Sequence, residues 1–166
     1  MPLERFWAAW REQYVAGTVA AHNAKDESEC VFCLLSNEEP SETSGVVWRN
    51  DTTFVALNAF PYGSGHLLVL PRRHVSSFAE LTDEEYTQYF LAVRHTVSAI
   101  EMTYGADGMN IGFNLGVAAG AGIPKHLHGH VLPRWTGDTS FMTAVGETRV
   151  LNESLSATWN KVHAHF

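Results

Sequence analysis

The chain has 166 residues, of which 45% are hydrophobic, and a formal net charge of −7 at pH 7. That length is enough for one domain with its own core, so we expect a single domain over residues 1–166. The acidic balance argues against broad binding of nucleic acids, and apolar runs such as residues 67–70 are too short to cross a membrane.

The N-terminal segment is predicted to contain one helix and a cysteine motif. Aromatic side chains recur at helical spacing over residues 3–15, which is typical of a short amphipathic helix packed on the body; they are Phe6, Trp7, Trp10 and Tyr14. The segment mixes both charge signs and lacks a long apolar stretch, so it does not resemble a secretory signal and we expect a cytoplasmic location. A polar linker then leads to Cys30 and Cys33.

Strand patterns begin at residue 46. β-Branched and aromatic residues over 46–49 and 52–57, separated by Asn50 and Asp51, predict a hairpin. A third strand is expected over 66–70, ended by the proline that follows it.

The clearest helix in the sequence begins at Thr82. Thr82 and Glu85 have the spacing of a capping box, apolar residues then recur at helical spacing, and Gly105 ends the helix after about six turns. Two more strands are expected over residues 109–115 and 126–133.

The last expected element is a helix over residues 151–163. Hairpins and short loops with one long crossover helix indicate an α+β fold, in which a mainly antiparallel five-stranded sheet carries helices on one face. We expect a core over residues 46–135, preceded by an N-terminal segment (1–45) and followed by a C-terminal segment (136–166).

Three histidines at alternate positions, His126, His128 and His130, form the most informative pattern in the chain. In a strand they would share one face, with neighbouring rings about 7 Å apart, and this face would be the one opposite the helices or its rim. The stretch 118–122 before them is nearly free of side chains, so its backbone N–H groups can approach an anion. Together the two features suggest a phosphate site. A row of solvated histidines at a sheet edge and a catalytic metal site with three histidine ligands are the alternatives.

Cys30 and Cys33 have the spacing of a zinc knuckle, although the chain has no second pair of this kind. A cytoplasmic location disfavours a disulfide. The remaining metal ligands would then be histidines, and unligated thiols in a loop are the alternative. We expect His66 to be structural rather than catalytic. The other histidines are expected to be solvated or to pack, namely His22, His95, His163 and His165.

Residues 126–132, HLHGHVL, resemble the His-φ-His-φ-His-φ-φ signature of the histidine triad (HIT) superfamily, in which φ is an apolar residue. The resemblance extends to residues 57–62, to residues 65–75 and to Asn114 with the loop that follows it. The flanks, residues 7–11 and 133–142, are similar to the branch that contains bacterial diadenosine tetraphosphate phosphorylases and fragile-histidine-triad hydrolases. The resemblance covers nearly the whole chain and implies a HIT-like fold stabilised by a structural zinc.

The resemblance also implies a role for individual residues. His128 would attack an α-phosphorus and become nucleotidylated, and His130 would bind phosphate and assist the leaving group. Asn58 and Phe60 would form the ribose and base pocket. Phosphate oxygens would be held by Asn114, Gly120, Ala121 and Gly122. Zinc would be bound by Cys30, Cys33, His74 and His126.

We therefore expect an enzyme that cleaves dinucleoside polyphosphates of the diadenosine tri- and tetraphosphate class through a covalent nucleotidyl-histidine, with water or inorganic phosphate as the acceptor. A purine nucleoside phosphoramidase that uses the same nucleophile and a nucleotide-binding module without turnover are the alternatives. No organic cofactor, nucleic-acid partner or membrane partner is expected. The resemblance further implies a homodimer that pairs through the long helix and an adjoining strand.

Two glycines depart from the family pattern. Gly129 stands where the signature has a bulky apolar residue. Because Gly129 faces away from the histidine row, we expect altered packing and intact chemistry. Gly122 stands where phosphorylase relatives tend to have a serine, which leaves the choice between phosphate and water open.

Overall fold

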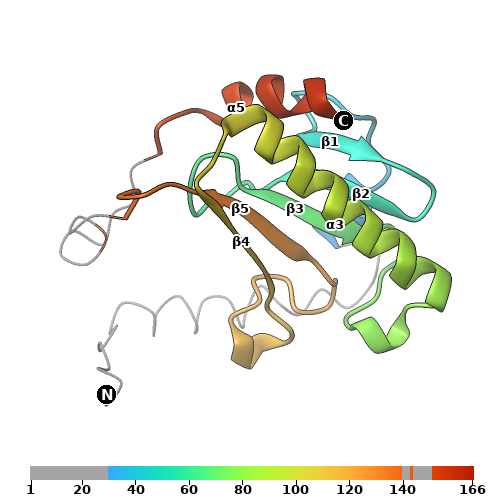
Figure 1. Cartoon of the computed structure of the whole chain (residues 1–166). Coiled ribbons are helices and arrows are strands. Elements are labelled where there is room, and N and C mark those ends of the chain that lie inside the picture. Colours follow the sequence, from blue (N-terminus) through green and yellow to red (C-terminus); the bar gives the residue numbers. More distant parts are fainter. Residues whose placement is uncertain (1–29, 140–142, 144–150) are drawn as a thin grey trace, which may run out of the picture.

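A five-stranded antiparallel sheet forms the centre of the fold (Figure 1), as predicted. The computed structural model describes residues 30–139, 143 and 151–166. The predicted helix over residues 3–15, the linker after it and His22 lie outside the described residues, and the single domain over the whole chain stays a prediction. In spatial order the strands are β1 (Val46–Arg49), β2 (Thr53–Leu57), β3 (Leu67–Pro71), β5 (Gly129–Arg134) and β4 (Gly108–Phe113).

The hairpin between β1 and β2 is confirmed, and the side chain of Asn50 shapes its turn. Oδ1 of Asn50 accepts hydrogen bonds from the backbone N–H groups of Thr52 and Thr53, at 3.0 and 2.7 Å. This Asx turn includes Thr52, so β2 begins at Thr53, one residue later than predicted. Pro71 is the last residue of β3 and lies opposite Thr53, the first residue of β2.

The long helix α3 (Asp83–Tyr104) has both predicted ends. Thr82 and Glu85 form a reciprocal capping box, and Gly105 ends the helix in the left-handed region with φ 52°. Helix α5 (Leu155–Val162) begins later than predicted because Ser154 caps it by accepting the N–H of Ala157. The short helices are α2 (Val31–Leu35), η2 (Phe78–Glu80), η3 (Val117–Ala119) and η4 (His163–His165). Within the described residues, none of the helices has the length and apolar character needed to cross a membrane.

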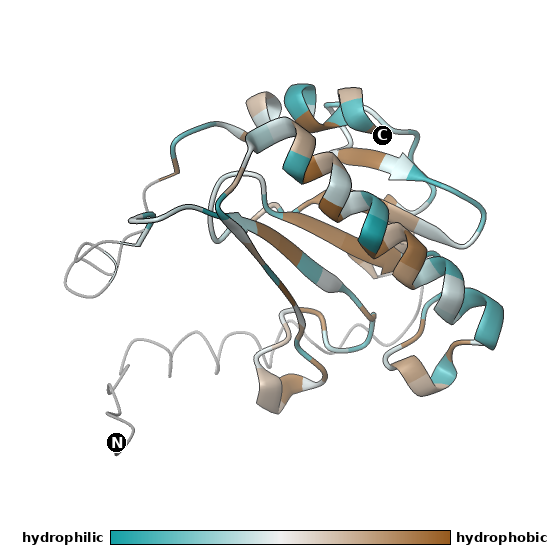
Figure 2. Ribbon diagram, viewed as in Figure 1, coloured by the Kyte–Doolittle hydropathy of each residue, from teal (hydrophilic) through white to brown (hydrophobic). Residues whose placement is uncertain are grey.

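Each face of the sheet carries its own buried cluster. Helix α3 lies across one face with α5 beside it, and brown apolar residues line the contact in Figure 2. This cluster includes Val69 and Val131 from the strands, Tyr89 and Ile100 from α3, and Val162 from α5. Alternate residues of β2 and β3 point to the other face, where they pack against Cys30 and Phe32 of the α2 region. The prediction that helices lie on one face therefore holds for α3 and α5 and is wrong for α2.

Strand β5 begins at Gly129, so the prediction of a strand over residues 126–133 was wrong at its start. The N–H of Leu127 donates to the carbonyl of Val75 at 2.6 Å, and the ring of His126 bonds the carbonyl of Pro71 at 2.9 Å. These bonds hold the segment before Gly129 against the end of β3 and the loop that follows it. Of the three histidines only His130 lies in the strand, opposite Leu68 and thus on the face away from α3.

Candidate functional site

The ring of His128 is buried and oriented by the backbone of its own segment. Nδ1 of His128 lies 2.8 Å from the carbonyl oxygen of His126. A carbonyl can only accept a hydrogen bond, so Nδ1 carries the proton and Nε2 keeps its lone pair. The ring of Phe32 packs on His128 with centroids 5.2 Å apart. His128 is therefore held in the tautomer that a nitrogen nucleophile requires.

The neighbouring His130 is oriented through His66. The backbone N–H of Tyr62 donates to Nδ1 of His66 at 3.0 Å, and the amide of Asn58 lies 3.3 Å from the same nitrogen. Nδ1 of His66 is thus an acceptor, which places the proton of His66 on Nε2. This Nε2 lies 3.0 Å from Nδ1 of His130 and donates to it. His66 was predicted to be structural rather than catalytic, and this hydrogen bond to His130 is a contact that the prediction did not include.

The chain of donors leaves the proton of His130 on Nε2. Among the described residues, Nε2 of His130 is the one buried side-chain nitrogen or oxygen without a hydrogen-bond partner. The rings of His128 and His130 lie 5.2 Å apart, roughly perpendicular to each other. The site therefore pairs a nitrogen lone pair with an N–H donor that has no protein acceptor, an arrangement suited to an anionic substrate.

Burial controls the charge of both rings. It lowers the pKa of His128 below the ordinary value for histidine. Burial also lowers the pKa of His130 to about 4, and the neighbouring His128 contributes in the same direction. Both imidazoles are consequently neutral at pH 7, which is the state that the two tautomers above describe.

The ring of Tyr62 packs on His130. Its ring stacks on His130 with centroids 5.5 Å apart and an interplanar angle of 26°, and contacts His66 at 4.6 Å. Tyr62 thus holds His130 through its ring and His66 through its backbone. Sequence reasoning missed this residue, although its place four positions before His66, in the loop that leads into β3, was a usable signal.

Of the predicted phosphate-binding residues, Asn114 directly follows a strand that pairs with β5. Phe113 of β4 is opposite Gly129 of β5, so continuing this register places Asn114 across from His128. In the loop that follows, the N–H groups of Gly120 and Ala121 donate to carbonyls of the same loop, those of Val117 and Gly116. An anion bound by these two amides would have to share or replace those bonds. The roles of Asn114 and residues 120–122 stay predictions.

Asn58 organises the loop between β2 and β3. Its Oδ1 accepts the N–H of Phe60 at 3.0 Å, and its backbone N–H donates to the carbonyl of His66. The ring of Phe60 is 84% exposed, so a nucleotide base could stack on it and would then shield the ring from solvent. A cavity of about 160 Å³ lies between this loop and residues 151–158. It is smaller than ligand pockets of about 300 Å³ or more, and its lining includes neither catalytic candidate nor Asn114, so we do not regard it as the nucleotide site.

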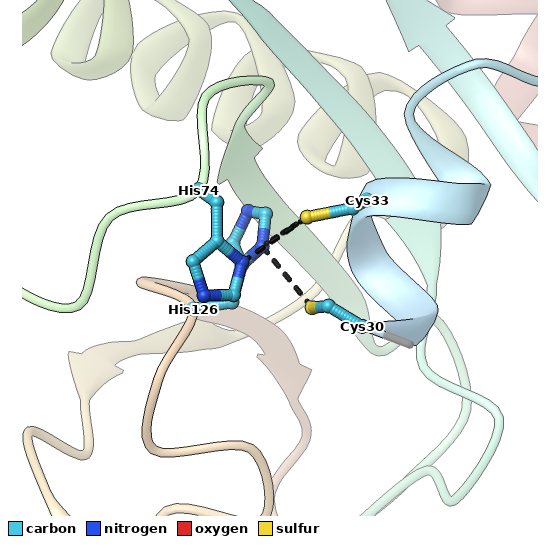
Figure 3. A group of neighbouring side chains, drawn as sticks. All are labelled: Cys30, Cys33, His74 and His126. Atoms are coloured by element: carbon cyan, nitrogen blue, oxygen red, sulfur yellow. Dashed lines mark hydrogen bonds between the residues drawn. The ribbon is translucent and has the colours of Figure 1, made fainter. Parts of the chain in front are cut away.

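Two cysteines and two histidines, side chains of the types that bind metal ions, converge in Figure 3. Their ligand atoms all lie within 4.8 Å of one another and belong to Cys30, Cys33, His74 and His126. The Sγ···Nδ1 distances are 3.1 Å for Cys33–His74 and 3.5 Å for both contacts of His126. A tetrahedral zinc separates its sulfur and nitrogen ligands by about 3.5 Å. The four residues therefore fit a zinc ion.

The orientation of His126 supports the same fit. Its Nε2 lies 2.9 Å from the carbonyl of Pro71, so Nε2 carries the proton and Nδ1 turns its lone pair toward the cysteines. Burial lowers the pKa of His126 to about 4 and keeps the ring neutral, as metal binding requires. This cluster takes only one imidazole from the histidine row, which weighs against a catalytic metal site made of all three.

Two of the histidines that were predicted to be solvated or to pack, His95 and His163, are packed in the structure. His95 contacts the rings of Trp48 and Phe166 at 5.4 and 4.9 Å. His163 stacks on Trp159 at 4.3 Å and bonds the carbonyl of Val47. Neither lies in the site.

Comparison with known proteins assigns this arrangement to a family. The HIT domain matches residues 39–137, which is more than half of the chain. The chain belongs to the HIT family. The predicted HIT-like α+β fold, with its five-stranded sheet, long helix and C-terminal helix, is thereby confirmed.

Relatives within the HIT family share much of the chain. An AP-4-A phosphorylase of Mycobacterium tuberculosis is 33% identical over 157 residues, which cover 94% of this chain and 80% of the relative. The bis(5'-nucleosyl)-tetraphosphatase (asymmetrical) of Schizosaccharomyces pombe is 38% identical over 97 residues, or 58% of this chain and 53% of that protein. The crystal structure of a zinc-bound histidine triad family protein from Mycobacterium smegmatis has a TM-score of 0.66 and 26% identity, and covers 84% of this chain and 94% of that one. The chain is thus a HIT-family nucleotide-binding enzyme.

The glycine that departs from the HIT signature faces α3, as predicted. A Cβ added at Gly129 would lie 2.6 Å from the ring of Phe113 and 2.8 Å from the hydroxyl of Tyr89. The space that a bulky apolar residue of the signature would take is therefore filled by these two rings.

Proposed function

We propose that this HIT-family enzyme cleaves dinucleoside polyphosphates of the diadenosine tri- and tetraphosphate class through a nucleotide bound covalently to His128. The observation that carries the proposal is the pair of fixed tautomers: the carbonyl of His126 leaves a lone pair on Nε2 of His128, and His66 leaves a proton on Nε2 of His130. The names of the phosphorylase and tetraphosphatase relatives support the substrate class.

In the first step Nε2 of His128 attacks the α-phosphorus. A P–N bond forms while the bond from phosphorus to the bridging oxygen breaks, and the nucleoside polyphosphate leaves as an anion. The Nε2–H of His130 donates a hydrogen bond to the oxygen on which charge develops, so that full proton transfer is not required. The carbonyl of His126 stabilises the positive charge that the ring of His128 gains.

In the second step an oxygen nucleophile displaces His128 and restores the neutral ring. Water gives a nucleoside monophosphate and releases one proton, whereas inorganic phosphate gives a nucleoside diphosphate. The exposed loop around Gly122 is the part of the site that would receive this acceptor. Two successive in-line displacements retain the configuration at phosphorus.

The metal in this proposal is structural. Cys30, Cys33, His74 and His126 would bind one zinc ion, which supplies folding energy and ties α2 to the segment that carries the histidines. The zinc-bound relative from Mycobacterium smegmatis supports the identity of the metal.

The oligomer that we propose is a homodimer formed by α3 and β4. Strand β4 is the last in the sheet order, and Ile111 on it is 49% exposed. The rings of Tyr86 and Phe90 on α3 are also exposed, and Phe90 lies 6.2 Å from Phe113 of β4. An open strand edge beside exposed aromatic rings is suited to pairing with a second copy. Light scattering should give twice the chain mass, and Phe90→Glu should give the monomer.

A rapid-quench experiment tests the proposed chemistry. Labelled diadenosine tetraphosphate, diadenosine triphosphate and adenosine phosphoramidate are each mixed with the enzyme, with and without inorganic phosphate. We expect an adduct of one nucleoside monophosphate on the peptide that contains His128, and no adduct or turnover with His128→Asn, which should still bind nucleotide. Preferred cleavage of the phosphoramidate would identify a phosphoramidase instead. Binding without turnover of any substrate, or inversion at phosphorus, would contradict the proposal.

A further inference from the structure

One buried hydroxyl reaches the sheet beside the catalytic histidines. Tyr89 of α3 is fully buried, and its hydroxyl donates to the carbonyl of Val69 in β3 at 2.7 Å. The same oxygen also lies against the backbone of Gly129 in β5, so close that a Cβ added at Gly129 would lie 2.8 Å from it. Val69 and Gly129 are opposite each other in the β3–β5 pair, at the end of the pairing where His128 leads into β5. The hydroxyl therefore bridges the two strands where their pairing ends.

The bridge acts on the peptide unit that joins the two catalytic candidates. The N–H of Gly129 belongs to the same planar unit as the carbonyl of His128. A group that packs against this peptide unit also fixes the plane from which the His128 side chain departs, and His130 follows one residue later. An error in this plane would move both rings, which lie 5.2 Å apart.

The absence of a side chain at Gly129 makes this bridge possible. A Cβ there would lie 2.8 Å from the hydroxyl of Tyr89 and 2.6 Å from the ring of Phe113. A phenylalanine at position 89 would fill the same apolar space without placing a polar group in the core. The hydroxyl is thus the part of Tyr89 that packing alone does not explain.

We infer that Tyr89 is a positioning residue for His128 and His130, and that Gly129 is the matched residue that admits its hydroxyl. The inference deepens the proposed function and rests on it for the catalytic role of the two histidines.

The test replaces one hydroxyl and follows both catalysis and the ring of His128. Tyr89→Phe should lower kcat about ten- to a hundredfold and change KM less than about twofold, because a small misplacement of a reacting group slows chemistry more than binding. The NMR signal of the Nδ1–H of His128, which is bonded to the carbonyl of His126, should shift or broaden. Thr96→Val is the matched control: it removes another buried hydroxyl of α3, which bonds only the helix carbonyl of Ala92. We expect wild-type kcat and an unchanged imidazole signal.

A second variant tests the pairing with Gly129. Gly129→Ala should displace the hydroxyl and lower kcat as Tyr89→Phe does, and the double variant should lose less than the product of the two single losses, because both remove the same bridge. Wild-type kcat and an unchanged imidazole signal in Tyr89→Phe, or fully multiplicative losses in the double variant, would overturn the inference. If the wild-type enzyme forms no adduct on His128, the proposed function fails, and the imidazole signal still decides whether Tyr89 positions the ring.

Discussion

Replacing His66 by leucine is the most direct perturbation of the donor chain in the site. In the native protein the N–H of Tyr62 donates to Nδ1 of His66, and Nε2 of His66 donates to Nδ1 of His130, each at 3.0 Å. Leucine removes both bonds and fills this position, which is 1% exposed, with an apolar side chain. The proton of His130 can then occupy Nδ1, in which case Nε2 no longer faces the substrate as a donor.

The size of the effect follows from these two bonds. A hydrogen bond between neutral groups contributes about 0.5–1.5 kcal/mol net, and leaving a buried partner unsatisfied costs about 1–3 kcal/mol. If about 1–2 kcal/mol of this fixes the productive tautomer of His130, kcat should fall about 5- to 30-fold. The unsatisfied nitrogens should also lower the melting temperature by several degrees, at about 2–4 °C for each kcal/mol.

Steady-state kinetics with diadenosine tetraphosphate and two companion variants separate this effect from general damage. His66→Gln keeps an N–H at the end of the side chain and should retain kcat within a few-fold of wild type. His163→Leu removes a histidine that bonds the carbonyl of Val47 far from the site and should have wild-type kcat. A His66→Leu enzyme with unchanged kcat, or leucine and glutamine variants that are equally slow, would refute the role of His66 in fixing the proton of His130.

Three further predictions concern the metal, the pH dependence and the phosphate site. Cys30→Ser should abolish zinc binding and lower the melting temperature by roughly 10 °C, since zinc present at about 1,000 times its Kd contributes about 4 kcal/mol, while kcat per folded molecule stays close to wild type; a zinc-free wild-type protein would contradict this. Burial lowers the pKa of His128 below its ordinary value and that of His130 to about 4. Histidine in an unfolded chain has a pKa of about 6.5, so the acid limb of kcat/KM should lie below pH 6.5. Between about pH 6.5 and pH 4 the histidines of the unfolded chain become protonated while these two buried rings stay neutral. The free energy of unfolding should therefore fall as the pH drops from about 6.5 toward 4. A melting temperature that rises as the pH drops over this range would argue against neutral rings. Asn114→Ala should lower kcat/KM by one to a few powers of ten, whereas an unchanged value would remove Asn114 from the site.

Local patterns predicted the parts of the fold whose ends depend on neighbouring residues. Thr82 and Glu85 begin α3, Gly105 ends it, and Asn50 turns the first hairpin, each through contacts within a few positions. The same reasoning indicated Cys30 and Cys33 as a candidate metal-binding pair. It could not name their partners, because Cys30 and His126 are separated by 96 positions. The family resemblance supplied His74 and His126, which the structure then places beside the two cysteines.

The sequence by itself determined the residue types of the site and the order of the strands' patterns, and the tertiary structure decided how the rings are held. The alternation of His126, His128 and His130 predicted a row on one strand, yet a strand exists only where it has partners, and β3 and β4 pair with this segment from Gly129 onward. Which nitrogen of His130 carries the proton depends on His66, 64 positions away. The hydroxyl that braces Gly129 comes from a helix on the opposite face of the sheet. Proton positions and ring orientations are set by such long-range contacts, which no local pattern in the sequence specifies.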